Sequence, residues 1–221
     1  MKILAVSDKE EKMLYSPTIA NRFKDVSLII GCGDLSYYYQ EYILSMLNVP
    51  MYYVRGNHAK IVEYGSGSQR CSPWGALDLH RKCRRTREGV ILSGVEGCIR
   101  YNRGNYQYLQ SEMWSHVFSL VPSFLLNRMR FGRFIDVFVS HAPPWGIHDE
   151  DDLAHHGAKA FRWLLKVFKP AVHFHGHIHI YNSQKATETL FGKTWVVNAY
   201  GYQEIELPLD ELENIPLKSI K

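Results

Sequence analysis

The sequence lacks any uninterrupted apolar run of about 18 residues, the length that a membrane-spanning helix needs. The apolar stretch near its start, Ile3–Val6, is too short for the core of a signal peptide. Cysteine is scarce, because the four cysteines form no Cys-x-x-Cys pair and do not reach the density of a disulfide scaffold. We therefore expect a cytoplasmic protein with no membrane partner and no disulfide framework.

Repeats and low-complexity tracts are also absent from the 221 residues, and the hydrophobic fraction of 46% is that of an ordinary folded protein. We expect a single domain over residues 1–221, interrupted at about 63–89 and 100–133. The first interruption is rich in Gly and Ser and then basic, and the second contains a helical run from Ser111 to Arg130 with Pro122 inside it.

Positive charge is concentrated in one segment. The chain has 26 Lys and Arg against 22 Asp and Glu, a formal charge of +4. His80–Glu88 holds five basic residues and one acidic residue, so the rest of the chain balances at 21 against 21. This distribution argues against a generally basic nucleic-acid surface and indicates one basic loop. Arg81 and Arg84 in this loop are predicted to hold or steer an anionic phosphate substrate.

Short apolar runs rich in Val, Ile, Phe and Tyr predict buried strands at 3–6, 26–30, 51–54, 90–92, 135–139, 171–174 and 195–197. Helical spacing predicts helices over 36–47 and around 161–168, and Ser16-Pro17 has the chemistry of a helix start. Strand and helix alternate early, and strands joined by a turn near Gly201 follow late. The pattern predicts an α/β fold with a mixed sheet or two sheets.

Polar residues follow five of the predicted strands, at the edge where open α/β sheets place ligands. They are Asp8 and Glu10, Asp34, Asn57 and His58, His141, and His177 and His179. These side chains offer oxygen and nitrogen donors without thiolate, which suits Mn, Fe or Zn with open coordination positions. More than four donors exceed one tetrahedral ion, whereas two ions sharing a carboxylate would use them all.

The order of these residues resembles the calcineurin-like metallophosphoesterase superfamily, with its motifs Asp-x-His, Gly-Asp, Gly-Asn-His, His and Gly-His-x-His. The matching blocks are Gly33-Asp34, Gly56-Asn57-His58, His141 and Gly176-His177-Ile178-His179. The resemblance implies two facing, mostly mixed β-sheets flanked by helices, an α/β/β/α sandwich. It also implies two divalent ions and hydrolysis of a phosphomonoester or phosphodiester, a small phosphate ester, by a metal-activated hydroxide.

The resemblance also implies a role for each residue. Asp34 would bridge the two metals, and His58 would stand beside the phosphate as the catalytic group. One metal would take Asp8, Asp34 and His179, and the other Asp34, Asn57, His141 and His177. His148, His155 and His156 lie in a loop that contacts substrate in some relatives, or they cap and cover the following helix.

The first block departs from the family pattern, because Asp8-Lys9-Glu10 has Glu where the family has His. In extended chain Glu10 would share a face with Asp8 and so reach the metals, where a carboxylate favours Mn or Mg over Zn. The departure also leaves open a non-catalytic scaffold with a weakened metal site. A nuclease that uses the loop at 80–87 on a nucleic-acid backbone is a further alternative. The sequence does not distinguish monoesters from diesters, and it leaves the oligomeric state open.

Overall fold

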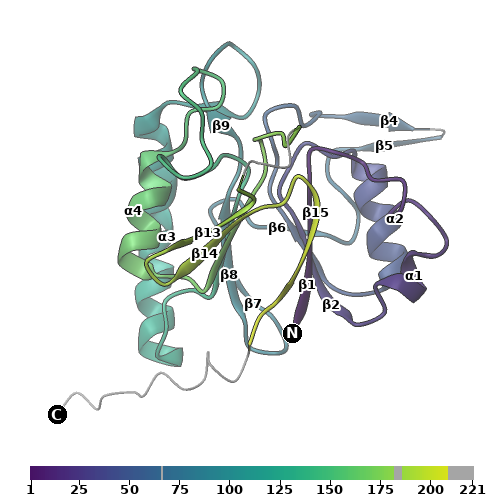
Figure 1. The fold of residues 1–221 in the computed structure, drawn as a ribbon, viewed down its shortest axis with the longest axis horizontal. Coiled ribbons are helices and arrows are strands. Elements are labelled where there is room, and N and C mark those ends of the chain that lie inside the picture. Colours follow the sequence, from purple (N-terminus) through teal and green to yellow (C-terminus); the bar gives the residue numbers. More distant parts are fainter. Residues whose placement is uncertain (66, 182–185, 209–221) are drawn as a thin grey trace.

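The computed structural model describes residues 1–65, 67–181 and 186–208, and most of their strands form two sheets that face each other (Figure 1). The first sheet has the order β15-β1-β2-β3-β6, in which β15 is antiparallel to β1 and the other pairs are parallel. Its strands are β1 Lys2–Ser7, β2 Val26–Gly31, β3 Met51–Tyr53, β6 Leu77–Asp78 and β15 Gly201–Glu206.

The second sheet has the order β13-β14-β12-β11-β8-β7, with a parallel centre and antiparallel strands at both edges. Its strands are β7 Cys83–Arg85, β8 Ile91–Val95, β11 Val137–Ser140, β12 Val172–His175, β13 Glu188–Phe191 and β14 Thr194–Asn198. Two short ladders lie outside the large sheets, formed by β4 Glu63–Gly65 with β5 Ser68–Arg70 and by β9 Cys98–Ile99 with β10 Gln107–Tyr108.

Helices cover the outer face of each sheet, so the molecule has four layers (Figure 1). In the described residues α1 Ile19–Arg22 and α2 Tyr37–Leu47 lie on the first sheet, and α3 Gln110–Phe131 and α4 Lys159–Phe168 lie on the second. Side chains on a strand alternate between faces. Ile3 and Ala5 accordingly enter the core between the sheets, whereas Leu4 and Val6 enter the core under α1 and α2. Burial on both faces explains why these strands are continuously apolar.

The predicted helix over 36–47 is confirmed. Ser36 is its N-cap, and the Ser36 side chain accepts a hydrogen bond from the Tyr39 N–H at 3.2 Å. The helix ends at Asn48, which adopts a left-handed conformation with φ of 52°. Helix α4 likewise begins before Phe161 and ends ahead of Pro170, as the sequence pattern predicts.

The helix start at Ser16-Pro17 is corrected by the structure. Helix α1 begins only at Ile19, and its N-cap Thr18 makes no side-chain capping hydrogen bond. The Ser16 hydroxyl lies instead 3.0 Å from the Thr18 hydroxyl. The helix has just four residues because Phe23 already leaves the helical conformation and β2 begins at Val26.

Both predicted interruptions contribute to the layers. Segment 63–89 contains β4 and β5 and adds β6 and β7 as edge strands of the two large sheets. Segment 100–133 contains α3, which connects the parallel strands β8 and β11 and includes Pro122. It therefore supplies the crossover helix of a βαβ unit. The expected domain over 1–221 also includes residues 66, 182–185 and 209–221, which lie outside the described residues.

None of the helices in the described ranges combines the length and the apolar character that crossing a membrane requires.

Candidate metal centre

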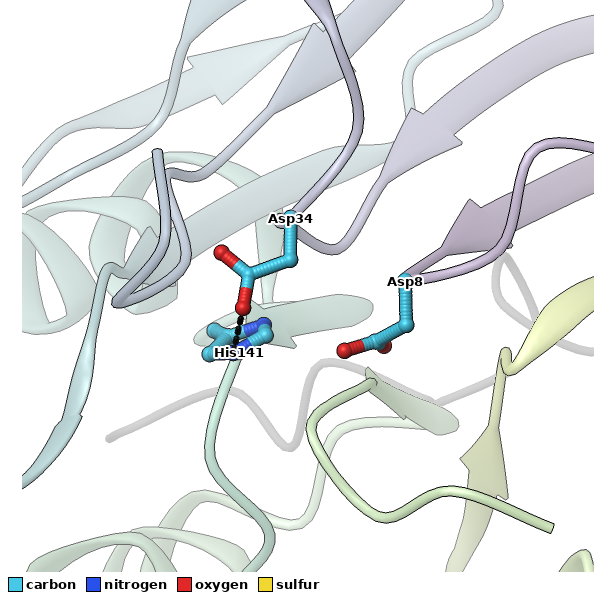
Figure 2. A group of neighbouring side chains, drawn as sticks. All are labelled: Asp8, Asp34 and His141. Carbon is cyan, nitrogen blue, oxygen red and sulfur yellow. Dashed lines mark ion pairs between the residues drawn. The ribbon is translucent and has the colours of Figure 1, made fainter. Parts of the chain in front are cut away.

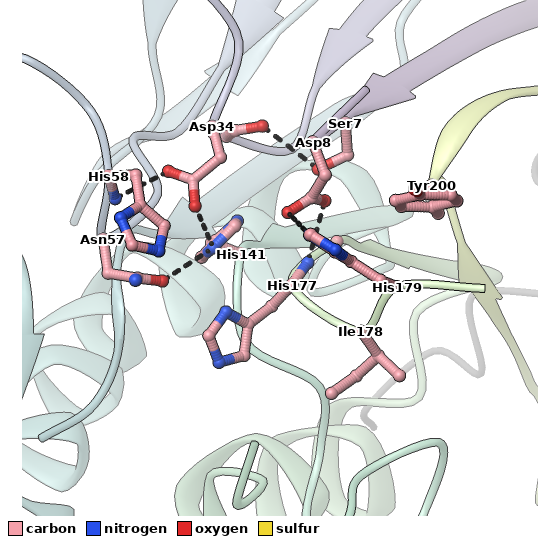
Figure 3. A network of polar contacts seen from close by, with 12 residues as sticks. Ser7, Asp8, Asp34, Asn57, His58, His141, His177, Ile178, His179 and Tyr200 are labelled. Carbon is pink, nitrogen blue, oxygen red and sulfur yellow. Dashed lines mark hydrogen bonds and ion pairs between the residues drawn. The ribbon is translucent and has the colours of Figure 1, made fainter. Parts of the chain in front are cut away.

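All the predicted ligands except Glu10 meet at one edge of the molecule, where the carboxyl ends of both sheets lie together (Figure 3). Asp8 follows β1 and His177 follows β12, and the His177 backbone N–H donates to the Asp8 carboxylate at 2.9 Å. This hydrogen bond joins the two sheets. The structure therefore brings side chains from five strand ends into one site, as the sequence pattern predicts.

His141 is the centre of the first ligand group. Its Nδ1–H donates to the Cys32 carbonyl at 2.8 Å, which leaves Nε2 to face the other ligands. Asp34 Oδ2 lies 3.1 Å from this Nε2, and Asn57 Oδ1 lies 3.0 Å from it. All three atoms carry lone pairs when His141 is neutral, so a proton or a metal ion must lie among them to make the arrangement favourable.

The proton fills this role when no metal is bound. Burial alone would lower the pKa of His141, but the charge and hydrogen bond of Asp34 raise it to about 9. Burial would likewise raise the pKa of Asp34, but His141 and the His58 backbone N–H lower it to about 2. The two groups form a buried ion pair, because the His141 side chain is 0% exposed and that of Asp34 is 7% exposed.

Asp8 and His179 form the second ligand group. The Asp8 side chain is 2% exposed, and its Oδ1 lies 3.6 Å from His179 Nε2. The hydrogen bond and charge of Asp8 raise the pKa of His179. The other ring nitrogen of His179 lies 2.7 Å from the Tyr181 hydroxyl. As at His141, one ring nitrogen has a partner outside the site and the other faces a carboxylate.

His177 shows the same arrangement. Its Nε2–H donates to the Ala154 carbonyl at 2.7 Å, so Nδ1 is left as an acceptor. Its ring lies 4.9 Å from the His141 ring. Burial and the His141 charge lower the pKa of His177 to about 4. A neutral imidazole whose other nitrogen donates to a backbone carbonyl is the form in which histidine binds a metal ion.

A metal ion fits this donor set. Potential ligand atoms of Asp8, Asp34 and His141 all lie within 4.8 Å of one another (Figure 2). The nearby Cys32 supplies only its backbone, because burial raises the pKa of its thiol well above the ordinary value. The centre therefore presents carboxylate, amide and imidazole donors, which suit Mn, Fe or Zn.

The backbone is strained where it presents the ligands. Asp8, Asp34 and His177 have positive φ angles of 62°, 55° and 67°. Each follows a strand, and few non-glycine residues adopt this left-handed conformation. Such a conformation costs about 1–3 kcal/mol and persists at functional sites where the surrounding structure enforces it. The three residues thus turn their side chains towards one another at a local cost in stability.

Two glycines permit the close approach of the ligand segments. A Cβ atom on Gly56 would overlap the Asp34 carboxylate and lie 2.7 Å from a carbon of the His141 ring. A Cβ atom on Gly176 would overlap the Ser7 hydroxyl. Both glycines belong to the motifs that carry the family resemblance, and the structure gives the steric reason for them.

His58 stands at the open side of the site. Its backbone N–H donates to Asp34 Oδ1 at 2.8 Å, and its exposed imidazole lies beside Asn57 (Figure 3). Within the part of the chain that the structure describes, the ring has no hydrogen-bond partner. It is placed to meet a substrate, and its catalytic role stays a prediction.

Glu10 has a different partner from the one expected. Its carboxylate accepts hydrogen bonds from the Ser36 N–H and hydroxyl, at the start of α2. The chain turns at Asp8, whose φ is positive, so Asp8 and Glu10 do not share the face of an extended strand. Ligation of a metal by Glu10 stays a prediction that its present contacts do not support.

The three histidines of the following loop lie in different places. His155 borders the site, with its ring 5.4 Å from that of His177. His148 lies behind the site, where its ring nitrogens form hydrogen bonds with His175 Nε2 at 2.9 Å and with the Thr189 hydroxyl at 2.8 Å. His156 bonds to the Asp152 carbonyl and lines a separate hollow beside Trp145. Of the three, His155 has the placement that a substrate contact requires.

The two arginines predicted to hold substrate lie away from the ligands. The Arg81 guanidinium donates to the Ser119 hydroxyl on α3. Arg84 lies on the antiparallel edge strand β7. It pairs with Leu92, which is near the amino end of β8. Since the ligands follow the carboxyl ends of the strands, Arg84 lies away from the centre, and the contact with Ser119 turns the Arg81 guanidinium towards α3. The nuclease hypothesis, which depends on this loop, loses its main support.

Sequence reasoning missed two contributors to the centre. The Tyr101 hydroxyl accepts a hydrogen bond from Asn57 Nδ2 at 3.0 Å and so directs the Asn57 carbonyl oxygen towards His141. The Ala154 carbonyl fixes the ring of His177. Neither has a local signal, because Tyr101 comes from the predicted interruption and the Ala154 contact is made by backbone.

The chain belongs to the calcineurin-like phosphoesterase superfamily, because the model of that superfamily domain matches residues 1–201. Comparison with curated proteins gives no match. One crystal structure resembles the fold with a TM-score of 0.61 at 14% identity, covering 92% of this chain and 94% of the other. The protein TT1561 of Thermus thermophilus has a TM-score of 0.59 at 15% identity, covering 90% and 89%. These likenesses confirm the predicted fold.

Proposed function

We propose that this member of a metal-dependent phosphoesterase superfamily hydrolyses a phosphomonoester or phosphodiester with two divalent ions. One observation carries the proposal: Asp34 Oδ2 and Asn57 Oδ1 lie 3.1 Å and 3.0 Å from His141 Nε2, and the other ring nitrogen of His141 already donates to a carbonyl. Three lone-pair donors aimed at one point have little use in a metal-free protein, where they require a buried proton.

The two ligand groups would divide the ions between them. Asp34, Asn57, His141 and His177 would hold one ion, and Asp8, Asp34 and His179 the other. When bound, such ions lower the pKa of water and neutralise phosphate charge. Mn, Fe and Zn all accept this donor set.

The protein's own groups would orient the reaction. Hydrogen bonds to the Cys32 and Ala154 carbonyls keep the rings of His141 and His177 turned towards the centre before substrate arrives. The exposed His58 imidazole would donate a proton to the departing ester oxygen or stabilise charge on the phosphate. A small phosphate ester would enter from the open side, where His58 and His155 border the site.

Hydrolysis of p-nitrophenyl phosphate and bis(p-nitrophenyl) phosphate with Mn, Fe, Co or Zn tests the proposal. We expect activity with at least one metal, and we expect His58→Ala to lower kcat about 10²–10⁴-fold while metal content stays unchanged. His156→Ala is the matched control, since its ring contacts the Asp152 carbonyl outside the centre. Metal-loaded protein that cleaves neither compound, with His58→Ala indistinguishable from wild type, would overturn the enzymatic proposal.

A non-catalytic scaffold is the second candidate, and the placement of Glu10 favours it. The carboxylate that replaces the usual histidine bonds to Ser36 and not to a ligand of the centre. One metal site would then have fewer protein ligands than the other. A metal count after reconstitution separates the two candidates, because the enzyme needs about two ions per chain whereas a scaffold would hold fewer than one.

A further inference from the structure

Helix α3 is apolar on two opposite sides. Its inner side packs against the second sheet through Met113, Val117, Leu120 and Phe124, all of them buried. Its outer side carries large apolar residues that are exposed to solvent, namely Phe118 at 52%, Leu125 at 51%, Leu126 at 42% and Met129 at 82%. The exposed residues fall three, four and seven positions apart, so they form one ridge along the helix.

The apolar ridge continues onto α4. The Trp163 ring of α4 lies 5.4 Å from the Phe118 ring and 5.5 Å from that of Trp114. One turn further along α4, Val167 is 43% exposed. Soluble proteins seldom expose contiguous apolar patches of several large side chains without using them for binding. We call the exposed surface of α3 and α4, with the adjacent strand β7, the outer helical face.

Basic residues surround the ridge. Those that form no ion pair with a carboxylate among the described residues are Arg85 on β7, Arg128 and Arg130 on α3, and Lys166 and Lys169 at α4. The sequence from 113 to 131 and the whole of α4 contain no Asp or Glu. The overall balance of charge outside His80–Glu88 therefore conceals a strongly positive face.

Contacts place β7 and both helices on the same face. The Arg85 guanidinium stands 4.7 Å from the centre of the Phe131 ring at the end of α3. Asn127 of α3 donates to the Cys83 sulfur of β7 at 3.1 Å. Arg128, Val167 and Lys169 line one hollow between α3 and α4. The basic loop predicted from the sequence is thus one border of a larger surface.

We propose that the outer helical face binds a lipid surface that carries anionic headgroups. An apolar ridge bordered by Arg and Lys is the pattern of a helix that lies in the interface of a membrane. Each basic side chain near an anionic leaflet adds attraction, and the long stems of Arg and Lys reach headgroups while the ridge enters the acyl boundary. The proposal concerns attachment to a surface and does not depend on the proposed hydrolysis.

The charge also decides against the other occupants. A second copy of the chain docked through this face would bring its own arginines and lysines against those of the first, and like charges repel. A nucleic acid would satisfy the basic residues, but it would leave Leu125, Leu126 and Met129 with little to contact on a phosphate backbone. The sequence expectation of no membrane partner rested on the absence of a long apolar run, and a face assembled from three separate elements contains no such run.

Co-sedimentation with vesicles tests the proposal on the full chain. We expect binding to phosphatidylcholine vesicles that contain about one quarter phosphatidylserine, weaker binding as salt rises, and little binding to phosphatidylcholine alone. Leu125→Gln with Met129→Gln should weaken binding about tenfold without changing the charge. Ile61→Gln with Tyr64→Gln is the matched control, because these residues are 59% and 73% exposed near the β4–β5 ladder, across the molecule in Figure 1.

A second pair of substitutions tests the charge. Arg130→Glu with Lys166→Glu should weaken binding at least tenfold, because each basic side chain near the leaflet is worth about fivefold. Thermal unfolding of every variant should match wild type, since all the altered side chains are exposed. The proposal is overturned by no binding to anionic vesicles at low salt, by equal binding to neutral ones, or by variants that bind like wild type. A dimer in sedimentation that Leu125→Gln with Met129→Gln dissociates would assign the face to a second copy.

Discussion

At the carboxyl edge of the sheets, Asp34 and His141 are buried and form an ion pair, whereas the basic residues around the ridge of the outer helical face are exposed and form no ion pairs with carboxylates among the described residues. Asp34 and His141 neutralise each other inside the protein. The strained backbone at Asp8 and His177 turns these two side chains towards the same site. Arg130 and Lys166 extend from helices into solvent. The ligands at the edge are therefore held in place by contacts within the protein, whereas the basic side chains of the outer helical face are left to contact solvent or a partner.

The largest expected effect comes from breaking the buried pair at the edge. His141→Ala leaves the Asp34 carboxylate buried without its cation, so we expect the metal-free protein to lose about 3–5 kcal/mol of unfolding free energy. Urea titration in the presence of a chelator measures the loss, with His156→Ala as the control. Adding Asp34→Asn to His141→Ala should recover part of it. Equal stabilities of His141→Ala and His156→Ala would mean that the pair contributes nothing.

A matched pair of truncations on α3 compares its two sides directly. Leu120→Ala removes a side chain that is 1% exposed in the core, so we expect a loss of about 2–5 kcal/mol. Leu125→Ala on the same helix removes a side chain that is 51% exposed and should change stability by less than about 0.5 kcal/mol. Chemical denaturation of both variants makes the measurement. A large loss from Leu125→Ala would show that the ridge serves folding and not binding.

Tyr101→Phe tests how far the edge depends on a residue outside its motifs. Without the Tyr101 hydroxyl, the Asn57 amide loses the acceptor that fixes its orientation. We expect about 10–100-fold weaker metal binding, the usual cost of losing a hydrogen bond to a metal ligand. Metal titration by calorimetry measures it. Tyr106→Phe is the control, because Asn57 donates to Tyr101 and not to Tyr106. Equal metal affinities of the two variants would show that the Tyr101 hydroxyl does not support the metal centre.

The comparison explains which parts were predictable from sequence. The ligands Asp34, His141 and His177 each come directly after or close to an apolar run, and parallel strands carry their carboxyl ends to one edge. The pattern of apolar runs followed by polar residues was therefore sufficient to predict that these ligands meet. Tyr101 and the ridge at Leu125 depend on how segment 100–133 packs, which pairs residues far apart in the sequence. The expected shared face of Asp8 and Glu10 does not form, because the backbone turns at Asp8 and the strand pattern does not continue past it.

Metal binding at the carboxyl edge should release a proton from His141, and this effect is smaller than those of the substitutions above. The pKa of His141 is raised to about 9, so at neutral pH a metal must displace its proton. Affinity should rise about tenfold per pH unit up to about pH 9, and calorimetry in buffers of different ionisation enthalpy should show about one proton released. In the metal-free protein, the stability from this raised pKa is complete below about 6.5 and is lost as pH rises through about 9. An affinity that does not change with pH would contradict the protonated state of His141 in the metal-free protein.

Glu10→Gln is expected to have the smallest effect and to decide between the two views of the first motif. As placed, the Glu10 carboxylate accepts from Ser36 at the start of α2, where a negative charge also interacts favourably with the helix dipole. Gln keeps an acceptor but removes the charge, so we expect a loss of about 0.3–1 kcal/mol in stability and an unchanged metal count. Elemental analysis of reconstituted protein and urea denaturation measure the two quantities. If the variant instead loses one metal ion at unchanged stability, the carboxylate is a ligand in the loaded protein, and it leaves Ser36 when the ion binds.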